Sequence, residues 1–77
     1  MKYQLVDVDL YNQTVTQSTV VDADSVVHAI TQHQGLKADE VVDLQEYLDE
    51  SKDHLKSTEG GWVLTGDELI TIITELN

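Results

Sequence analysis

Residues 38–55 carry two stripes of opposite character, and this pattern constrains the fold more than any other part of the chain. Five carboxylates recur at spacings of 4, 3, 4 and 3 residues, at Asp39, Asp43, Glu46, Glu50 and Asp53. At about 100° per residue they fall within about 80° of arc on one face of an α-helix. Apolar side chains gather on the opposite face, at Val41, Leu44, Leu48 and Leu55. The segment therefore predicts an amphipathic helix over about 38–55, with an apolar stripe inward and an acidic ridge outward.

The N-terminal third predicts a β-hairpin. Along residues 3–10, three apolar side chains alternate with two acids, so that Val6, Val8 and Leu10 share one face and Asp7 and Asp9 the other. This is the pattern of a half-buried strand whose acids face water. The sequence Tyr-Asn-Gln follows as a turn, with its central Asn in a left-handed conformation. Residues 14–21 are rich in β-branched side chains and predict the second strand.

A first helix is predicted over about 23–34. Asp22, Asp24 and Ser25 have short side chains that cap unpaired N–H groups at a helix start. Gly35 is well placed to end the helix in a left-handed conformation. His33 falls on the apolar face of this helix, which predicts a packed core or interface residue.

The C-terminal segment predicts a short strand and a last helix. Gly60 and Gly61 mark a turn, and the apolar run at 62–64 predicts a strand beside the hairpin. Thr65 and Glu68 have the spacing of a capping box. Apolar residues then follow at helical spacing, at Leu69, Ile70, Ile72, Ile73 and Leu76.

These elements predict the α+β class in the order ββααβα. The expected architecture is a three-stranded sheet, made of the N-terminal hairpin and one strand near 62–64, packed by three helices in a single small acidic domain over 1–77. A mostly helical bundle with a short hairpin is the alternative. There is no cysteine, so no disulfide supports the core.

The charge balance narrows the classes of partner. Fifteen acids against four lysines, with no arginine, give a net charge of −11. The negative field of the protein repels a phosphate backbone, and arginine, the side chain that usually binds phosphate and guanine, is missing. Direct nucleic-acid binding is therefore not expected, and a charged protein partner is expected to be basic. Plain solubility is the competing explanation of the acidity.

No residue pattern predicts catalysis, a cofactor or a metal. His28 and His33 are five residues apart and so point about 140° apart on a helix. Asp22 and Asp24 do not continue into a calcium loop, because the later ligand positions hold valine and histidine. No nucleophile elbow or phosphate-binding glycine loop is present. We expect a protein that is not an enzyme, with no cofactor.

Binding is therefore the favoured class of function. The leading hypothesis is a protein-interaction or accessory/regulatory domain that binds a basic partner through the acidic ridge. Carboxylates three and four residues apart on a helix repel one another, and no lysine lies between these five to offset the repulsion, which favours a surface made for a cationic partner. The alternatives are a nucleic-acid mimic that occupies a DNA-binding protein, and a small subunit of a larger complex. A weak homodimer with contacts near the last helix or Trp62 is also expected. With no apolar run long enough to span a membrane and no signal peptide, we expect a cytoplasmic protein.

Overall fold

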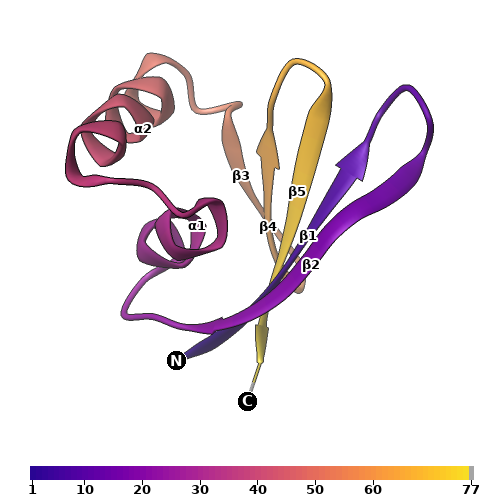
Figure 1. The fold of residues 1–77 in the computed structure, drawn as a ribbon, viewed down its shortest axis with the longest axis horizontal. Coiled ribbons are helices and arrows are strands. Elements are labelled where there is room, and N and C mark those ends of the chain that lie inside the picture. Colours follow the sequence, from indigo (N-terminus) through magenta and orange to yellow (C-terminus); the bar gives the residue numbers. More distant parts are fainter. Residues whose placement is uncertain (77) are drawn as a thin grey trace.

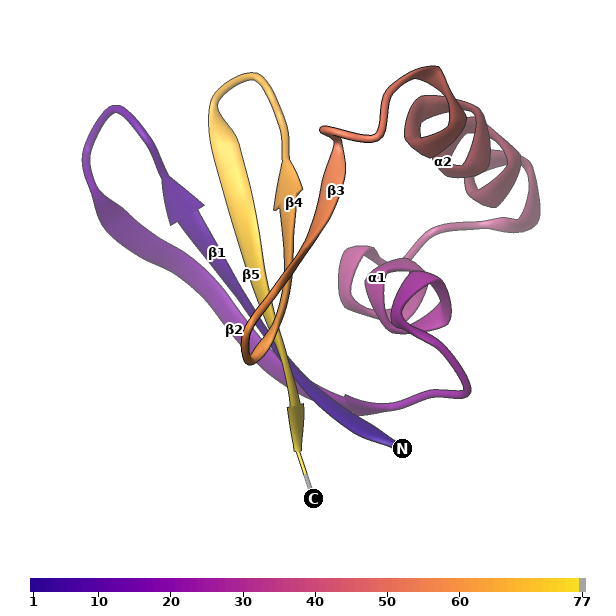
Figure 2. The same cartoon turned by 180° about the vertical axis from the view of Figure 1, so that it is seen from behind.

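The computed structural model of the protein describes residues 1–76, which form five strands and two helices. In chain order these are β1 (Lys2–Asp9), β2 (Thr14–Asp22), α1 (Val26–Gln34), α2 (Ala38–Glu50), β3 (Leu55–Thr58), β4 (Gly61–Thr65) and β5 (Leu69–Leu76). The strands make one sheet in the order β2-β1-β5-β4-β3, and every neighbouring pair is antiparallel. Both helices lie on the same side of this sheet (Figures 1 and 2), and α1 is the one that packs closely on β1 and β2.

The predicted last helix is wrong, because residues 69–76 form strand β5 between β1 and β4. Residues 70–74 are all β-branched, which favours a strand once hydrogen-bonding partners are present on both sides. Thr71 and Ile73 are buried on the helix side, whereas Ile70 and Ile72 face the other side. A strand with apolar residues on both faces gives a run that periodicity does not separate from a helix.

The predicted capping box is also absent from residues 1–76, since Thr65 ends β4 and a tight turn leads into β5. The Gly66 N–H donates to the Leu69 carbonyl across this turn at 2.8 Å. Upstream, α2 ends at Glu50, and Leu55 begins strand β3 in place of a last helical turn. The three-stranded sheet with three helices is therefore replaced by a larger antiparallel sheet with helices on one face.

The ends of α1 confirm two predicted caps. The Ser25 side chain accepts the His28 N–H at 3.1 Å, and Gly35 follows the helix in a left-handed conformation with φ of 66°. In the β1–β2 turn, Gln13 and not Asn12 takes the positive φ, at 56°. Asp9 closes this turn by accepting the backbone N–H groups of Asn12 at 3.0 Å and Tyr11 at 2.8 Å. These two hydrogen bonds lower the pKa of Asp9 below its ordinary value.

Strand β1 lies with the opposite face inward from the one predicted. Tyr3, Leu5 and Asp7 are buried against the helices, and Val6 and Val8 lie on the open face of the sheet. Both sets are apolar enough to be covered, but the inward set carries the larger side chains. The predicted exposure of Asp7 is therefore wrong, and this carboxylate needs buried partners.

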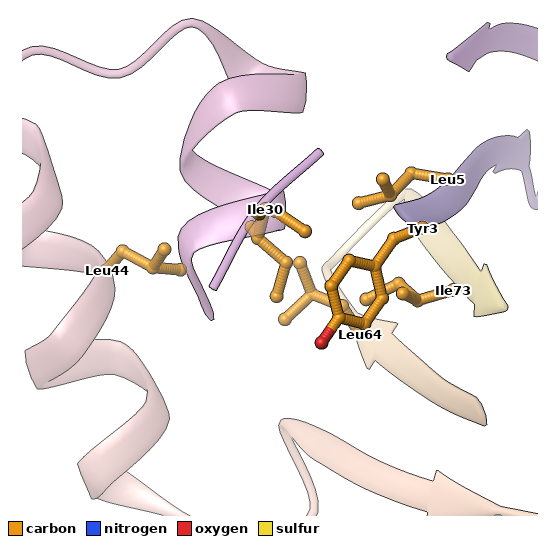
Figure 3. Packing of buried hydrophobic residues seen from close by; sticks show 8 residues of the cluster. Tyr3, Leu5, Ile30, Leu44, Leu64 and Ile73 are labelled. Carbon is orange, nitrogen blue, oxygen red and sulfur yellow. The ribbon is translucent and has the colours of Figure 1, made fainter. Parts of the chain in front are cut away.

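The core lies between the sheet and the two helices. Figure 3 shows Leu44 reaching from α2 toward Ile30 of α1, and Ile30 pointing at the side chains of the sheet. The buried hydrophobic residues are Tyr3, Leu5, Ala23, Ala29, Ile30, Leu44, Leu64 and Ile73.

Candidate functional site

The acidic ridge survives in the structure as four carboxylates. Asp39, Asp43, Glu46 and Glu50 lie on α2 and are exposed; together they are called the α2 ridge below. Asp53, the fifth predicted member, lies beyond the end of the helix and pairs with Lys56 at 3.5 Å. The predicted helix is too long by one turn at this point, which separates Asp53 from the row.

The orientation of α2 comes from its apolar side. Leu44 is buried and Val41 and Leu48 are half-buried, as the sequence predicts for the side opposite the carboxylates. Tyr47, which the prediction did not include, is half-buried as well. The Tyr47 hydroxyl donates to the Thr65 carbonyl and ties the helix to β4. Because these contacts hold the inner side toward α1 and the end of β4, the α2 ridge points to solvent.

A stacked ring pair fixes the C-terminal end of α2. The His54 imidazole lies parallel to the Tyr47 ring, with ring centres 3.8 Å apart and an interplanar angle of 6°. Its Nδ1 atom is 2.5 Å from the Tyr47 carbonyl oxygen. This contact gives a hydrogen-bonding partner to one of the last four carbonyl groups of the helix, which have none within the helix itself. His54 is half-buried and has a structural role.

The α2 ridge has no internal counter-charge within residues 1–76. The ion pairs of this described part involve Asp22 with the N-terminus and Asp53 with Lys56, and Asp7 lies close to the His33 ring. The ridge carboxylates repel one another at i,i+3 and i,i+4 spacing, at a cost of about 0.2–0.5 kcal/mol per pair. A cation brought to this face would therefore gain attraction from several carboxylates at once.

A groove of about 380 Å³ runs between α2 and the strands β4 and β5. Four leucines line it, at Leu36, Leu44, Leu64 and Leu69. On the α2 side two carboxylates also line it, those of Glu40 and Asp43. Asp43 belongs both to the groove and to the α2 ridge, so the two features are continuous. The Glu40 carboxylate also accepts the Lys37 N–H at 3.1 Å, which holds it at the start of the helix. An apolar groove bordered by carboxylates suits a ligand that has both an apolar and a cationic group.

A buried polar cluster lies beneath this groove. Asp7 Oδ1 accepts the Thr71 hydroxyl at 2.6 Å and lies 3.0 Å from His33 Nε2. On the other side of the ring, His33 Nδ1 is 2.5 Å from the Thr19 hydroxyl. The Nε2 atom makes no aligned hydrogen bond with Asp7, so that contact is a close approach and not a directed hydrogen bond.

The order of hydroxyl, imidazole and carboxylate in this cluster resembles the order of groups in a nucleophile relay. Asp7 and His33 are only 7% and 5% exposed, and of the residues described only Thr71 among these four lines the groove. The cluster therefore links β1, β2, β5 and α1 inside the molecule, and Thr71 is its point of contact with the groove. Sequence reasoning placed His33 in the core but missed Asp7 as its partner; the alternation of Asp7 with Tyr3 and Leu5 is the signal that marks this position as inward.

Over residues 1–76, no three His, Asp or Glu side chains converge in a way that could hold a metal ion. Neither helix of this described part is long and apolar enough to cross a membrane.

Comparison with known proteins finds no matching family model, no similar curated protein and no similar solved structure. Function is therefore inferred from the residues of this chain alone.

Proposed function

We propose that this domain is a non-enzymatic interaction module that binds a basic protein segment along α2. In this interaction an apolar side chain of the segment enters the groove, and neighbouring lysine or arginine side chains lie over the α2 ridge. The observation that carries the proposal is the continuity of an apolar groove with an acidic helix face through Asp43. A cytoplasmic setting and an accessory or regulatory role stay predictions within this proposal.

The groove is the reason to favour a peptide ligand over nucleic-acid mimicry. The α2 ridge is one straight row spanning about 17 Å, the length of eleven helical steps. The phosphates of a DNA strand follow a helical path over a comparable length and do not form a straight row. Leucines beside the carboxylates also add nothing to the imitation of a phosphate backbone. A segment with both apolar and cationic side chains uses both features, as in other groove-binding peptides.

A random peptide library displayed on phage and selected against the immobilised protein tests the proposal. The expected peptides share an apolar residue flanked by lysine or arginine. Binding of the corresponding synthetic peptides should weaken as salt is raised, because the rim charges are screened. Amide chemical-shift changes should concentrate on α2, Leu36 and Leu69.

Two neutral variants and one control sharpen the test. Glu40→Gln and Asp43→Asn keep the size of each side chain, and the glutamine still accepts the Lys37 N–H. Each should weaken peptide binding about two- to fivefold, the range for an exposed ion pair. Glu59→Gln removes the same charge in the β3–β4 turn, away from the groove, and should leave binding unchanged. Selected peptides without basic residues, or equal effects of all three variants, would overturn the proposal.

A further inference from the structure

The face of the sheet opposite the helices carries an aliphatic cluster. The pairing registers place Val6 beside Ile72, Ile72 beside Val63, and Val8 between Ile70 and Val15. Ile72 is 41% exposed and Val15 is 62% exposed. No helix within residues 1–76 covers this face, since α1 and α2 both lie on the other side (Figures 1 and 2). We call the cluster the open-face patch; its members are Val6, Val8, Val15, Val63, Ile70 and Ile72.

The open-face patch is free of carboxylates in a strongly acidic protein. On the strands described, charged side chains that share this face occur at Lys2, Asp22 and Lys56, all away from its centre. Asp22 is the acid among them, and it pairs with the N-terminal ammonium at 3.1 Å. Two copies of this face can therefore approach without the repulsion that a net charge of −11 predicts for other orientations.

The size of the sheet matches a weak dimer interface. Strands about 4.8 Å apart and up to nine residues long give a face of roughly 500 Å², allowing for the shorter β3 and β4. Stable interfaces bury about 800 Å² per partner, and transient ones less than about 600 Å². An interface confined to this face therefore belongs to the transient range.

We propose that the open-face patch is a self-association surface on which a second copy of this chain docks face to face. The two sheets pack as a sandwich about 10 Å apart, related by a two-fold axis, with aliphatic side chains of one copy between those of the other. A basic partner has no group to meet here, whereas an identical aliphatic face is complementary to it. This surface is separate from α2, which stays exposed in the dimer, so the inference does not depend on the proposed function.

The geometry relocates the dimer contacts expected from the sequence. Ile70 and Ile72, which the sequence placed on a last helix, lie in the open-face patch on β5. Trp62 does not, because it lies on the helix side and packs against Tyr3 with ring centres 6.1 Å apart.

Sedimentation equilibrium over a range of protein concentrations tests this inference. The parent protein should show a reversible monomer–dimer equilibrium that strengthens with added salt, since salt screens the remaining repulsion. Ile72→Glu places a charge in the centre of the patch and should weaken dimerisation at least tenfold. Gln45→Glu adds the same charge on an exposed position of α2 and should leave the dimer essentially intact.

Circular dichroism establishes that each variant is folded. If Ile72→Glu fails to fold, Val15→Glu replaces it, because this position is more exposed and near the end of β2. A parent protein that stays monomeric at high concentration, both with and without added salt, would overturn the inference. So would a dimer that persists in the folded patch variants, because such a dimer must use another surface, for example the free edge of β2.

Discussion

Replacement of Asp7 by alanine should be one of the most damaging single changes to this domain. Asp7 is 7% exposed, and its Oδ1 atom accepts the Thr71 hydroxyl and contacts the His33 ring. In Asp7→Ala, both polar groups stay inside the core without their acceptor. An unsatisfied buried group costs about 1–3 kcal/mol.

The geometry sets the expected value near the middle of that range. The Thr71 hydroxyl loses a well-formed hydrogen bond, but His33 Nε2 loses only a contact that is not aligned as a hydrogen bond. We therefore expect Asp7→Ala to lower the free energy of unfolding by about 2 kcal/mol. A domain of this length is stable by roughly 4–12 kcal/mol, so the loss is about a sixth to a half of the total.

Urea denaturation followed by tryptophan fluorescence measures this loss, and a mutant cycle identifies its origin. Thr71→Val removes the hydroxyl at nearly constant shape and should cost about 1 kcal/mol. The double variant should cost less than the sum of the two single changes, by about 1 kcal/mol, because no hydroxyl is then left without an acceptor. Asp67→Ala, an exposed turn position, should stay within about 0.5 kcal/mol of the parent. A cost of Asp7→Ala below about 1 kcal/mol, or strict additivity in the cycle, would refute the buried cluster as a stabilising link.

Three further changes test other parts of the structure. Glu46→Lys should leave the free energy of unfolding unchanged or raise it by a few tenths of a kcal/mol through relief of like-charge repulsion; a loss above about 2 kcal/mol in urea would contradict the outward orientation of the α2 ridge. Gly61→Ala should cost more than about 2 kcal/mol, because its Cβ would lie 1.9 Å from a β5 carbonyl oxygen, whereas Gly60→Ala has open space and should be nearly neutral; equal denaturation midpoints would argue against the β4–β5 register. The lowered pKa of Asp9 stabilises the fold above its unfolded pKa of about 4, and this contribution is lost as the pH falls through the folded value; Asp9→Asn should therefore flatten the acid limb of stability measured between about pH 2 and pH 5, and an unchanged limb would exclude this origin.

Local signals in the sequence were sufficient for part of the fold. The cap at Ser25 and the left-handed Gly35 follow from side-chain size and backbone freedom, which need no distant partner. The division of α2 into an apolar and an acidic side is likewise a property of one helix. The N-terminal hairpin was predicted, but not which face of β1 is covered.

Elements that depend on distant partners were not predictable in the same way. Strand β5 pairs with β1, which lies at the other end of the chain, and this pairing decides between strand and helix for a run that is apolar on both faces. Asp7 can be buried because its carboxylate contacts the His33 ring and accepts the Thr71 hydroxyl, and Thr71 is 64 residues away in the sequence. For the candidate site, four ridge carboxylates were predicted, but the groove beside them was not, because its leucines come from α2, β4, β5 and the α1–α2 link.

The distribution of charge over the two sides of the sheet favours function over solubility alone. Acids that serve only to keep a domain dispersed are expected on all exposed surfaces, mixed with cations. Here the α2 ridge concentrates them on the helix side, whereas the open-face patch has none at its centre. A dimer joined through that patch would direct its two ridges outward in opposite directions. Each ridge would then bind its own basic segment, and two segments of one partner would be held together only if the chain between them spans the sandwich. Peptide titrations at concentrations above and below the dimer transition should therefore give one site per chain in both regimes, with higher apparent affinity in the dimer only for tandem peptides with a long linker.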